Sequence, residues 1–199
     1  MSSATSDPVE APPTRRRSRV TLVIAVVVAA VAVLLVVLLA TSPQGERSTA
    51  SPLLGKLAPD IQAADTSGRE VRIDDYRGRW LLVNFFATWC GPCKVEHPQL
   101  VAFNDRHRLR GDAAVISVAF NEQPSEVQAF FDENGGDWPV IAEGNGRFAL
   151  QYGVVKLPES YLIAPDGTVV DKFEGGVTAD GIDSIIEQLT SPSDDGSGS

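Results

Sequence analysis

The feature that most constrains the fold is a Cys-x-x-Cys pair that lies between two segments of different periodicity. Cys90 and Cys93 are the two cysteines of this 199-residue chain. The residues before them, Trp80–Ala87, are apolar except for Asn84, as expected for a strand buried on both faces. The residues after them, Cys93–Arg110, have apolar side chains at helical spacing. This order predicts a strand, a turn and a helix, with Cys90 at the exposed N-terminal end of the helix.

The predicted position of the cysteines favours redox chemistry. The first turn of a helix has N–H groups without partners and a dipole that favours negative charge, so a thiol there loses its proton more readily. The thiolate is the reactive form of cysteine. Pro92 lacks an N–H, which the first helical turn does not need. We therefore expect Cys90 to attack a disulfide and Cys93, one turn deeper, to resolve the mixed disulfide.

Two other roles for the cysteines are weighed against this one. A structural disulfide over so short a loop contributes only about 2 kcal/mol in the chain-entropy model, so the fold would gain little from it. A zinc site needs two more ligands, and the soft candidates, His97 and His107, do not follow a zinc-finger spacing. A redox dithiol is the preferred interpretation, with no metal and no cofactor other than the Cys90–Cys93 pair.

The residues around the cysteines resemble a known family. W-C-G-P-C-K after F-x-x-T is similar to the thioredoxin active-site motif, and V-N-F-F-A-T-W-C-G-P-C-x-x-E-H-P resembles the TlpA/ResA/CcmG (DsbE) branch of membrane-anchored thioredoxins. The resemblance extends from about Leu57 to Leu189. It implies an α/β thioredoxin fold, in which a mixed central sheet is flanked by helices. It also implies a TlpA-like N-terminal hairpin and a central βα insert at about Asn134–Val154.

The remaining pattern fits this fold. The turn Asp65–Gly68 separates two short runs, Ile61–Ala64 and Arg69–Ile73, and predicts a hairpin. Further strands are expected at Ala113–Phe120, Trp138–Ala142, Ser160–Ala164 and Thr168–Phe173, and helices at Ser125–Asn134, Arg147–Tyr152 and Thr178–Leu189. The apolar residues at helical spacing in Cys93–Arg110 are Val95, Leu100, Val101, Phe103 and Leu109. In the two later helices, the residues expected to face inward are Val127, Phe130, Phe131, Ile182, Ile185, Ile186 and Leu189. This order of elements predicts a mixed sheet with helices on both faces.

The first forty residues predict a membrane anchor. Residues 1–19 are expected to form a disordered, basic, cytoplasmic N-terminus, because Ser, Pro and Ala dominate Met1–Thr14 and four arginines follow. Val20–Ala40 is apolar apart from Thr21 and is long enough for a transmembrane signal-anchor helix across about 30 Å of hydrocarbon. A cleaved signal peptide is the alternative, although the apolar run exceeds the usual ~7–15 residues. The arginines favour a cytoplasmic N-terminus, which places the rest of the chain outside the cell membrane.

The part of the chain beyond the anchor is expected to be one domain with two appendages. We expect a linker at residues 41–56, a thioredoxin-like domain at 57–190 and a disordered acidic tail at 191–199. The formal net charge is −9, and four arginines precede Val20, so the part after the anchor is strongly acidic. An acidic domain disfavours nucleic acid and anionic lipid as partners.

The resemblance implies further site residues on both sides of the cysteines. Trp89, Gly91 and Pro92 are expected to shape the surface that a substrate approaches. The string G-V-x-x-x-P-E-S-Y-L-I resembles the family's cis-proline loop, which implies that Leu157 and Pro158 lie opposite the cysteines. In the family this loop leaves a backbone edge for an extended substrate. The alternatives are a purely packing role for Trp89 and an ordinary strand-start proline at Pro158.

A proton acceptor near Cys93 would speed release of the product. Thioredoxins commonly have a buried aspartate where this chain has Asn84, and an amide cannot titrate. The resemblance implies two substitutes, Glu122, which matches a family glutamate near the dithiol, and Glu159, which follows the proline. Either could instead be a solvated surface carboxylate. His97 is expected on the surface of the helix.

These observations predict a thiol-disulfide oxidoreductase that is tethered outside the cytoplasmic membrane. The resemblance implies a reductant of exported proteins, such as apocytochrome c during cytochrome c maturation, with a DsbD/CcdA-type membrane thiol carrier as electron donor. The Gly-Pro pair between the cysteines resembles reducing thioredoxins, near about −270 mV, more than strong oxidants. A general reductase or oxidase and a metal or haem carrier without turnover remain alternatives. A peroxidase is disfavoured, because the Pro and Thr of the peroxiredoxin pattern are Val83 and Ala87 here.

Overall fold

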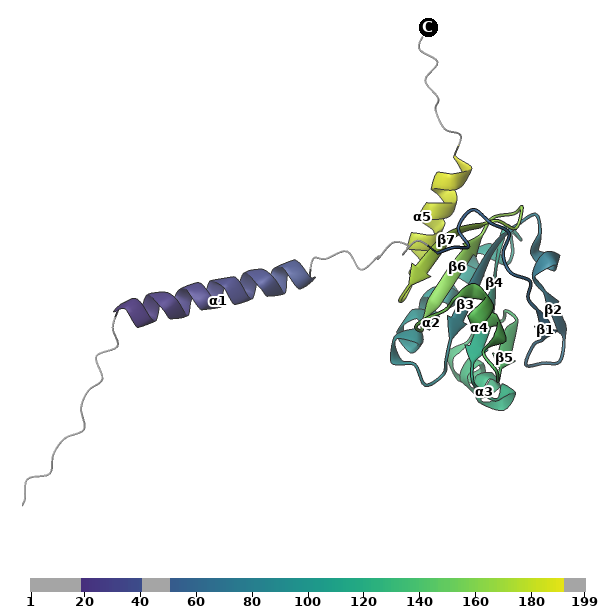
Figure 1. Ribbon diagram of the computed structural model, residues 1–199, viewed down its shortest axis with the longest axis horizontal. Helices are drawn as coiled ribbons and strands as arrows, with labels where there is room; N and C mark the ends of the chain where they lie inside the picture. The colour runs from purple at the N-terminus through teal and green to yellow at the C-terminus, as the bar shows by residue number, and fades with distance from the viewer. Residues whose placement is uncertain (1–18, 41–50, 192–199) are drawn as a thin grey trace, which may run out of the picture. The chain divides into compact units, whose positions relative to one another are not determined.

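The computed structural model describes residues 19–40 and 51–191 (Figure 1). The chain divides into two units, Met1–Gln44 and Gly45–Ser199. Helix α1 (Arg19–Ala40) lies in the first unit, and every other described element lies in the second. The predicted N-terminal tail, most of the predicted linker and most of the predicted acidic tail fall outside the described residues.

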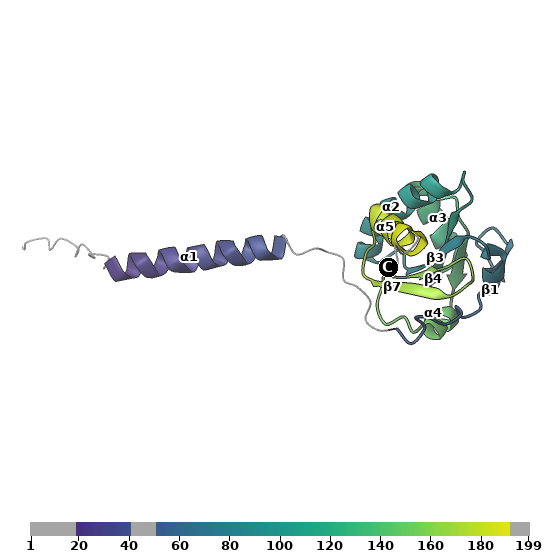
Figure 2. The same cartoon turned by 90° about the horizontal axis from the view of Figure 1, so that it is seen from above.

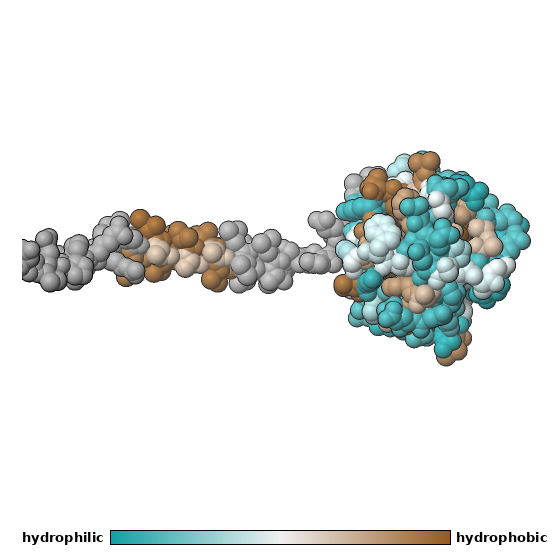
Figure 3. All heavy atoms as spheres, turned by 90° about the horizontal axis from the view of Figure 1, so that it is seen from below, coloured by the Kyte–Doolittle hydropathy of each residue, from teal (hydrophilic) through white to brown (hydrophobic). Residues whose placement is uncertain are grey.

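Helix α1 coincides with the apolar segment that the sequence analysis singled out. Its side chains are described for residues 22–34, where they are exposed, and Figure 3 shows their apolar surface in brown. Over the residues that the structure describes, no helix is both long enough and apolar enough to cross a membrane.

A five-stranded mixed sheet forms the centre of the second unit, in the order β5-β4-β3-β6-β7. Its strands are β3 (Trp80–Phe86), β4 (Ala113–Phe120), β5 (Val140–Glu143), β6 (Glu159–Ile163) and β7 (Val169–Glu174). β3 lies in the middle, parallel to β4 and antiparallel to β6, and all seven of its residues are buried. The chain therefore reaches the cysteines directly from a central strand that is buried along its whole length.

Helices cover both faces of this sheet, as predicted (Figure 2). On one face, α2 (Gly91–His107), α3 (Pro124–Asn134) and α5 (Ala179–Thr190) share a hydrophobic core. On the other, α4 (Arg147–Tyr152) packs with the hairpin of β1 (Gln62–Ala64) and β2 (Glu70–Arg72) and with the 3-10 helix η1 (Ile73–Tyr76). The mixed sheet, the hairpin and the inserted β5 and α4 confirm the predicted fold class.

The buried face of α2 differs from the predicted one. Val95 and Leu109, two of the apolar residues at helical spacing, are 79% and 86% exposed, whereas Glu96 and His97 are buried. The buried residues of α2 are Cys93, Glu96, His97, Leu100, Phe103, Asn104 and His107. Residues three and four apart share a helix face, so the row that starts at Cys93 excludes Val95. Leu109 lies after α2, which ends at His107 and not at Arg110 as predicted. Leu189, in the last turn of α5, is also exposed, contrary to prediction.

The folded unit begins before the predicted boundary at Leu57. Leu53 and Leu54, predicted as linker, pack against the core on the hairpin side of the sheet. The backbone N–H of Gly55 donates to the carbonyl of Val169 in β7 at 2.9 Å. Because these contacts bury apolar surface and pair the edge of a strand, this segment is part of the folded unit.

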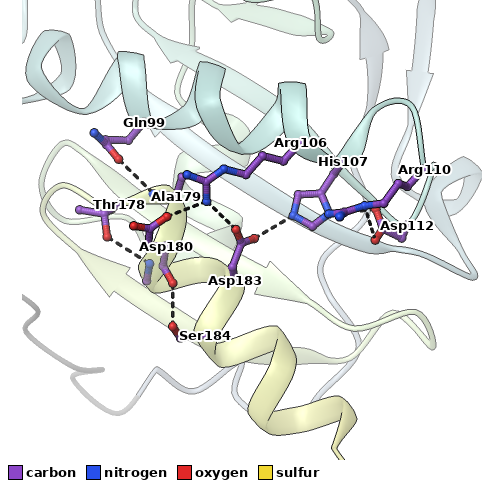
Figure 4. A network of polar contacts seen from close by, with 11 residues as sticks. Gln99, Arg106, His107, Arg110, Asp112, Thr178, Ala179, Asp180, Asp183 and Ser184 are labelled. Atoms are coloured by element: carbon purple, nitrogen blue, oxygen red, sulfur yellow. Dashed lines mark hydrogen bonds and ion pairs between the residues drawn. The ribbon is translucent and has the colours of Figure 1, made fainter.

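A polar network joins the C-terminal end of α2 to α5 (Figure 4). Arg106 donates to Asp180 and Asp183 at 2.7 Å each. The two ring nitrogens of His107 lie 2.8 Å from carboxylate oxygens of Asp112 and Asp183. This network holds α2 at the end opposite to the cysteines.

Candidate active site

The two cysteines lie at the start of α2 and are joined by a disulfide bond. Cys90 is the N-cap residue, and its Sγ accepts the backbone N–H of Cys93 at 3.3 Å. This confirms the predicted place of Cys90 at the N-terminal end of the helix. Its predicted exposure is wrong: Cys90 is 7% and Cys93 3% exposed, because both pack into the core beneath α2. Trp89 beside them is 65% exposed.

Glu122 holds the segment that leads into Cys90. After β4, Asn121 turns the chain with a φ of 54°, a conformation that Asn tolerates better than most residues. The buried carboxylate of Glu122 accepts the backbone N–H of Thr88 at 2.9 and 3.0 Å, and it also accepts the Thr88 hydroxyl. Glu122 therefore lies near the dithiol segment, as the resemblance implied, but it is buried, and its described hydrogen bonds go to Thr88.

An apolar groove of about 480 Å³ opens beside Cys90. Four of the predicted substrate-contacting residues line it: Trp89, Gly91, Pro92 and Leu157. Residues that the sequence did not single out complete the lining: Phe120, Ala149, Val154, Val155 and Lys156. Since Ala149 belongs to α4 and Val154 follows it, the inserted part of the fold forms one wall of the groove.

The loop opposite the cysteines has the predicted form. The peptide bond between Leu157 and Pro158 is cis. The carbonyl of Pro158 accepts the N–H of Gly175 at 2.9 Å, which ties the loop to the end of β7. Leu157 and Cys90 line the same groove, so the loop faces the disulfide.

Glu159 is fully buried directly after this loop, so it is not a solvated surface carboxylate. Its Oε2 lies 3.1 Å from Nζ of Lys172 in β7. Its Oε1 accepts the backbone N–H groups of Val155 and Lys156 at 3.2 Å each. This ion pair could not be predicted from local sequence, because Glu159 lies on β6 and Lys172 on β7.

Glu96 is a buried carboxylate that the sequence analysis did not single out. It is 3% exposed and lies one helical turn after Cys93 on the same face of α2. Its Oε2 accepts the side-chain N–H of Asn84 at 3.2 Å, and its Oε1 accepts the backbone N–H of Val177 at 3.1 Å. Asn84 cannot titrate, but it holds a residue that can.

Burial sets the acidity of Glu96. Desolvation raises the pKa of Glu96 to about 7, although hydrogen bonds from Val177 and Asn84 act in the opposite direction. A carboxyl group that changes its charge near neutral pH can accept a proton and return it. The signal was present in the sequence, because E-H-P follows the cysteines and position 96 is three residues after Cys93.

His97 is buried, contrary to the predicted surface position. Its Nε2–H donates to the carbonyl of Gly135 at 2.9 Å, and its ring packs against Phe130, Phe131 and Trp138. Burial lowers the pKa of His97, against the opposite effect of the Gly135 hydrogen bond. The contacts of His97 join α2 to α3, which is a packing role.

Comparison with known sequences agrees with this geometry. The redoxin family model matches residues 53–189. Thiol-disulfide oxidoreductase ResA of Geobacillus thermodenitrificans is 31% identical over 136 residues, which are 68% of this chain and 78% of that protein. The protein of the same name from Bacillus subtilis is 32% identical over 124 residues, which are 62% of this chain and 69% of that protein.

Solved structures give the same result for the fold. A thiol:disulfide interchange protein of the thioredoxin family from Chlorobium tepidum has a TM-score of 0.61 at 25% identity, over 66% of this chain and 94% of that one. A DsbF homologue from Corynebacterium diphtheriae has a TM-score of 0.64 at 22% identity, over 74% of this chain and 96% of that one, which is a likeness of fold alone.

Proposed function

The chain belongs to the redoxin family and is a thiol-disulfide oxidoreductase of the ResA and DsbE type, and from this premise we propose that it reduces disulfides of exported proteins outside the cytoplasmic membrane. The observation that carries the proposal is the Cys90–Cys93 pair at a helix start beside an apolar groove. Within this class, the proposed substrate is apocytochrome c, whose C-x-x-C-H haem-attachment cysteines must be thiols. The cysteine pair is the redox group, and we propose no further cofactor.

The first proposed step is attack by Cys90 in the reduced enzyme. Its thiolate attacks one sulfur of a substrate disulfide, so that an S–S bond forms between Cys90 and the substrate while the other substrate sulfur leaves as a thiolate. The free N–H groups at the helix start stabilise the attacking thiolate. The groove between Trp89 and Leu157 receives an extended substrate segment.

The second proposed step is resolution by Cys93. Its thiolate attacks Sγ of Cys90, the second substrate sulfur leaves, and the Cys90–Cys93 disulfide forms, so that two electrons have passed to the substrate. Cys93 must first lose a proton, and we propose that Glu96 accepts it. Glu122 and Glu159 remain proposed contributors through the backbone segments that their carboxylates hold.

The reaction needs an electron donor, because each turnover leaves the cysteine pair oxidised. Disulfides persist outside the cytoplasm, where soluble cytoplasmic reductants do not reach. We therefore propose a DsbD/CcdA-type thiol carrier that spans the membrane and re-reduces Cys90–Cys93.

A single signal-anchor helix at Val20–Ala40 is the proposed tether, because the segment carries no charge and arginines precede it. Protease added to cells stripped of any outer barrier is expected to remove the folded unit. Immunoblotting of the full chain measures this loss, and a cytoplasmic protein that stays intact is the control. Complete protection of the folded unit would contradict the proposed topology.

Deletion of the gene is expected to lower covalently bound haem in c-type cytochromes and to leave b-type haem unchanged. An added external thiol is expected to restore part of the c-type haem, because the missing function is reduction and not haem delivery. Haem staining of separated membrane proteins measures the first, and difference spectra measure the second. Unchanged c-type haem in the deletion strain would exclude apocytochrome c as the main substrate and leave a general reductase.

A further inference from the structure

Lys172 is a buried cation in a position where strand lysines are usually exposed. Its side chain is 7% exposed, and Nζ lies 3.1 Å from Oε2 of Glu159 and 3.1 Å from Oε1 of Glu174. Burial acts to lower the pKa of Lys172, but the hydrogen bonds to Glu174 and Glu159 outweigh it and raise the pKa. Lys172 therefore keeps its charge and neutralises a carboxylate that water does not reach.

Glu159 connects this cation to the loop that faces the disulfide. The oxygen that does not face Lys172 accepts the N–H groups of Val155 and Lys156, and both residues line the groove beside Cys90. The hydroxyl of Tyr161 lies 3.4 Å from the oxygen that faces Lys172. The Glu159 carboxylate thus spans from β7 to the wall of the groove.

A second contact links Lys172 to the loop Val155–Pro158, through Glu174. Nζ of Lys156 lies 3.3 Å from Oε2 of Glu174, whose other carboxylate oxygen faces Lys172. Lys172 is therefore linked to the loop by two routes, through Glu159 to backbone N–H groups and through Glu174 to a side chain. The ion pair of the exposed Lys156 contributes little, so Lys172 acts on the loop mainly through the buried carboxylate of Glu159.

We propose that Lys172 is a positioning residue for thiol-disulfide exchange. By holding the Glu159 carboxylate, it fixes the position of the loop Val155–Pro158 relative to Cys90, so that an extended substrate segment can bind between them. The inference rests on the proposed function, since it concerns how a substrate polypeptide is held. Without Lys172, the buried carboxylate is left without a cation, and a carboxylate that turns away from this site releases the two backbone N–H groups.

The test compares two reactions of the reduced full-length enzyme. Lys172→Met is expected to slow reduction of an extended peptide that contains one disulfide by about tenfold or more, because small misplacements at a reacting site have large effects on rate. The reaction of Cys90 with iodoacetamide is expected to stay unchanged, because this small reagent does not use the loop. Lys172→Arg, which keeps the charge, is expected to recover most of the peptide reaction.

The matched control is Asp183→Asn, which removes a carboxylate from the network between α2 and α5 at the far end of the helix. It is expected to leave the peptide reaction unchanged. An unaltered peptide rate in Lys172→Met, or an equal fall in both reactions, would overturn the positioning role. An equal loss of the peptide reaction in Asp183→Asn would also overturn it. A wild-type enzyme that does not reduce the peptide would instead contradict the proposed function.

Discussion

Replacing Cys93 with serine is expected to stop turnover and to accumulate enzyme that is covalently joined to its substrates. Cys90 lines the groove beside the exposed Trp89, whereas Cys93 is absent from the groove lining and lies deeper on the buried face of α2. Attack by Cys90 remains possible in Cys93→Ser, but no thiolate is present to resolve the mixed disulfide. Turnover is expected to fall on the order of 10³-fold or more, as for loss of other covalent nucleophiles.

Non-reducing electrophoresis after rapid acid quenching measures the trapped species, and a reductant should release them. The matched variant is Cys90→Ser, which is expected to lose turnover equally and to trap nothing. Trapping by Cys90→Ser and not by Cys93→Ser would assign the attack to Cys93. The trapped proteins can be identified by mass spectrometry, so the same variant identifies the substrates.

Glu96→Gln is expected to change how the stability of the enzyme depends on pH. Ionisation of Glu96 in the folded state is unfavourable, because burial raises its pKa from 4.5 to about 7. Below the unfolded-state pKa of 4.5, Glu96 is protonated and neutral in both the folded and the unfolded protein. Its full contribution to stability is therefore present in that pH range. As the pH rises through about 7, the folded protein loses about 3 kcal/mol of this contribution.

Denaturant unfolding of the oxidised full-length protein at about pH 4 and about pH 8 measures this contribution. Glu96→Gln has no proton to lose, so its stability relative to the wild type should increase by about 3 kcal/mol between these values. The amide also changes a hydrogen bond to Asn84, and the part of that change that does not depend on the charge of Glu96 cancels between the two pH values. A constant stability difference would show that Glu96 does not titrate in this range.

The same variant tests the proposed proton acceptor. In the reduced enzyme, Glu96→Gln is expected to alter the pH dependence of thiol alkylation, and Glu122→Gln is expected to alter it more than Asp132→Asn, a surface control on α3. A titration curve for Glu122→Gln that matches the wild type would remove Glu122 from the acid-base mechanism. A matching curve for Glu96→Gln would do the same for Glu96.

The chemistry of the cysteines could be predicted because it depends on neighbours in the sequence. The apolar run into Cys90, the proline after it and the helical spacing beyond it are local, and the structure has the predicted strand, turn and helix at that place. The cis bond before Pro158 followed from a family motif and is also present. Features that depend on one short segment could therefore be predicted from the sequence.

The partners of the buried charges could not be predicted, because they depend on distant segments. Glu96 meets the backbone of Val177, and Glu159 meets Lys172, so each pair forms only after the sheet and helices have assembled. Hydrophobicity also misidentified the inner face of α2, since it favoured Val95 over a buried acid. The positions three and four residues apart that follow Cys93 form the buried face of α2, whatever the polarity of their side chains.

The enclosure of β3 has a consequence for when the enzyme can act. This strand is paired along both edges and buried on both faces, and such elements open last in a folded protein. The backbone that leads into the cysteines therefore has little freedom to move when a partner binds, so the change of conformation has to occur in the partner. A cysteine pair inside a finished domain cannot straighten to fit the groove, whereas a newly exported chain can. Under the proposed function, the stiffness of this strand favours substrates that have not yet folded.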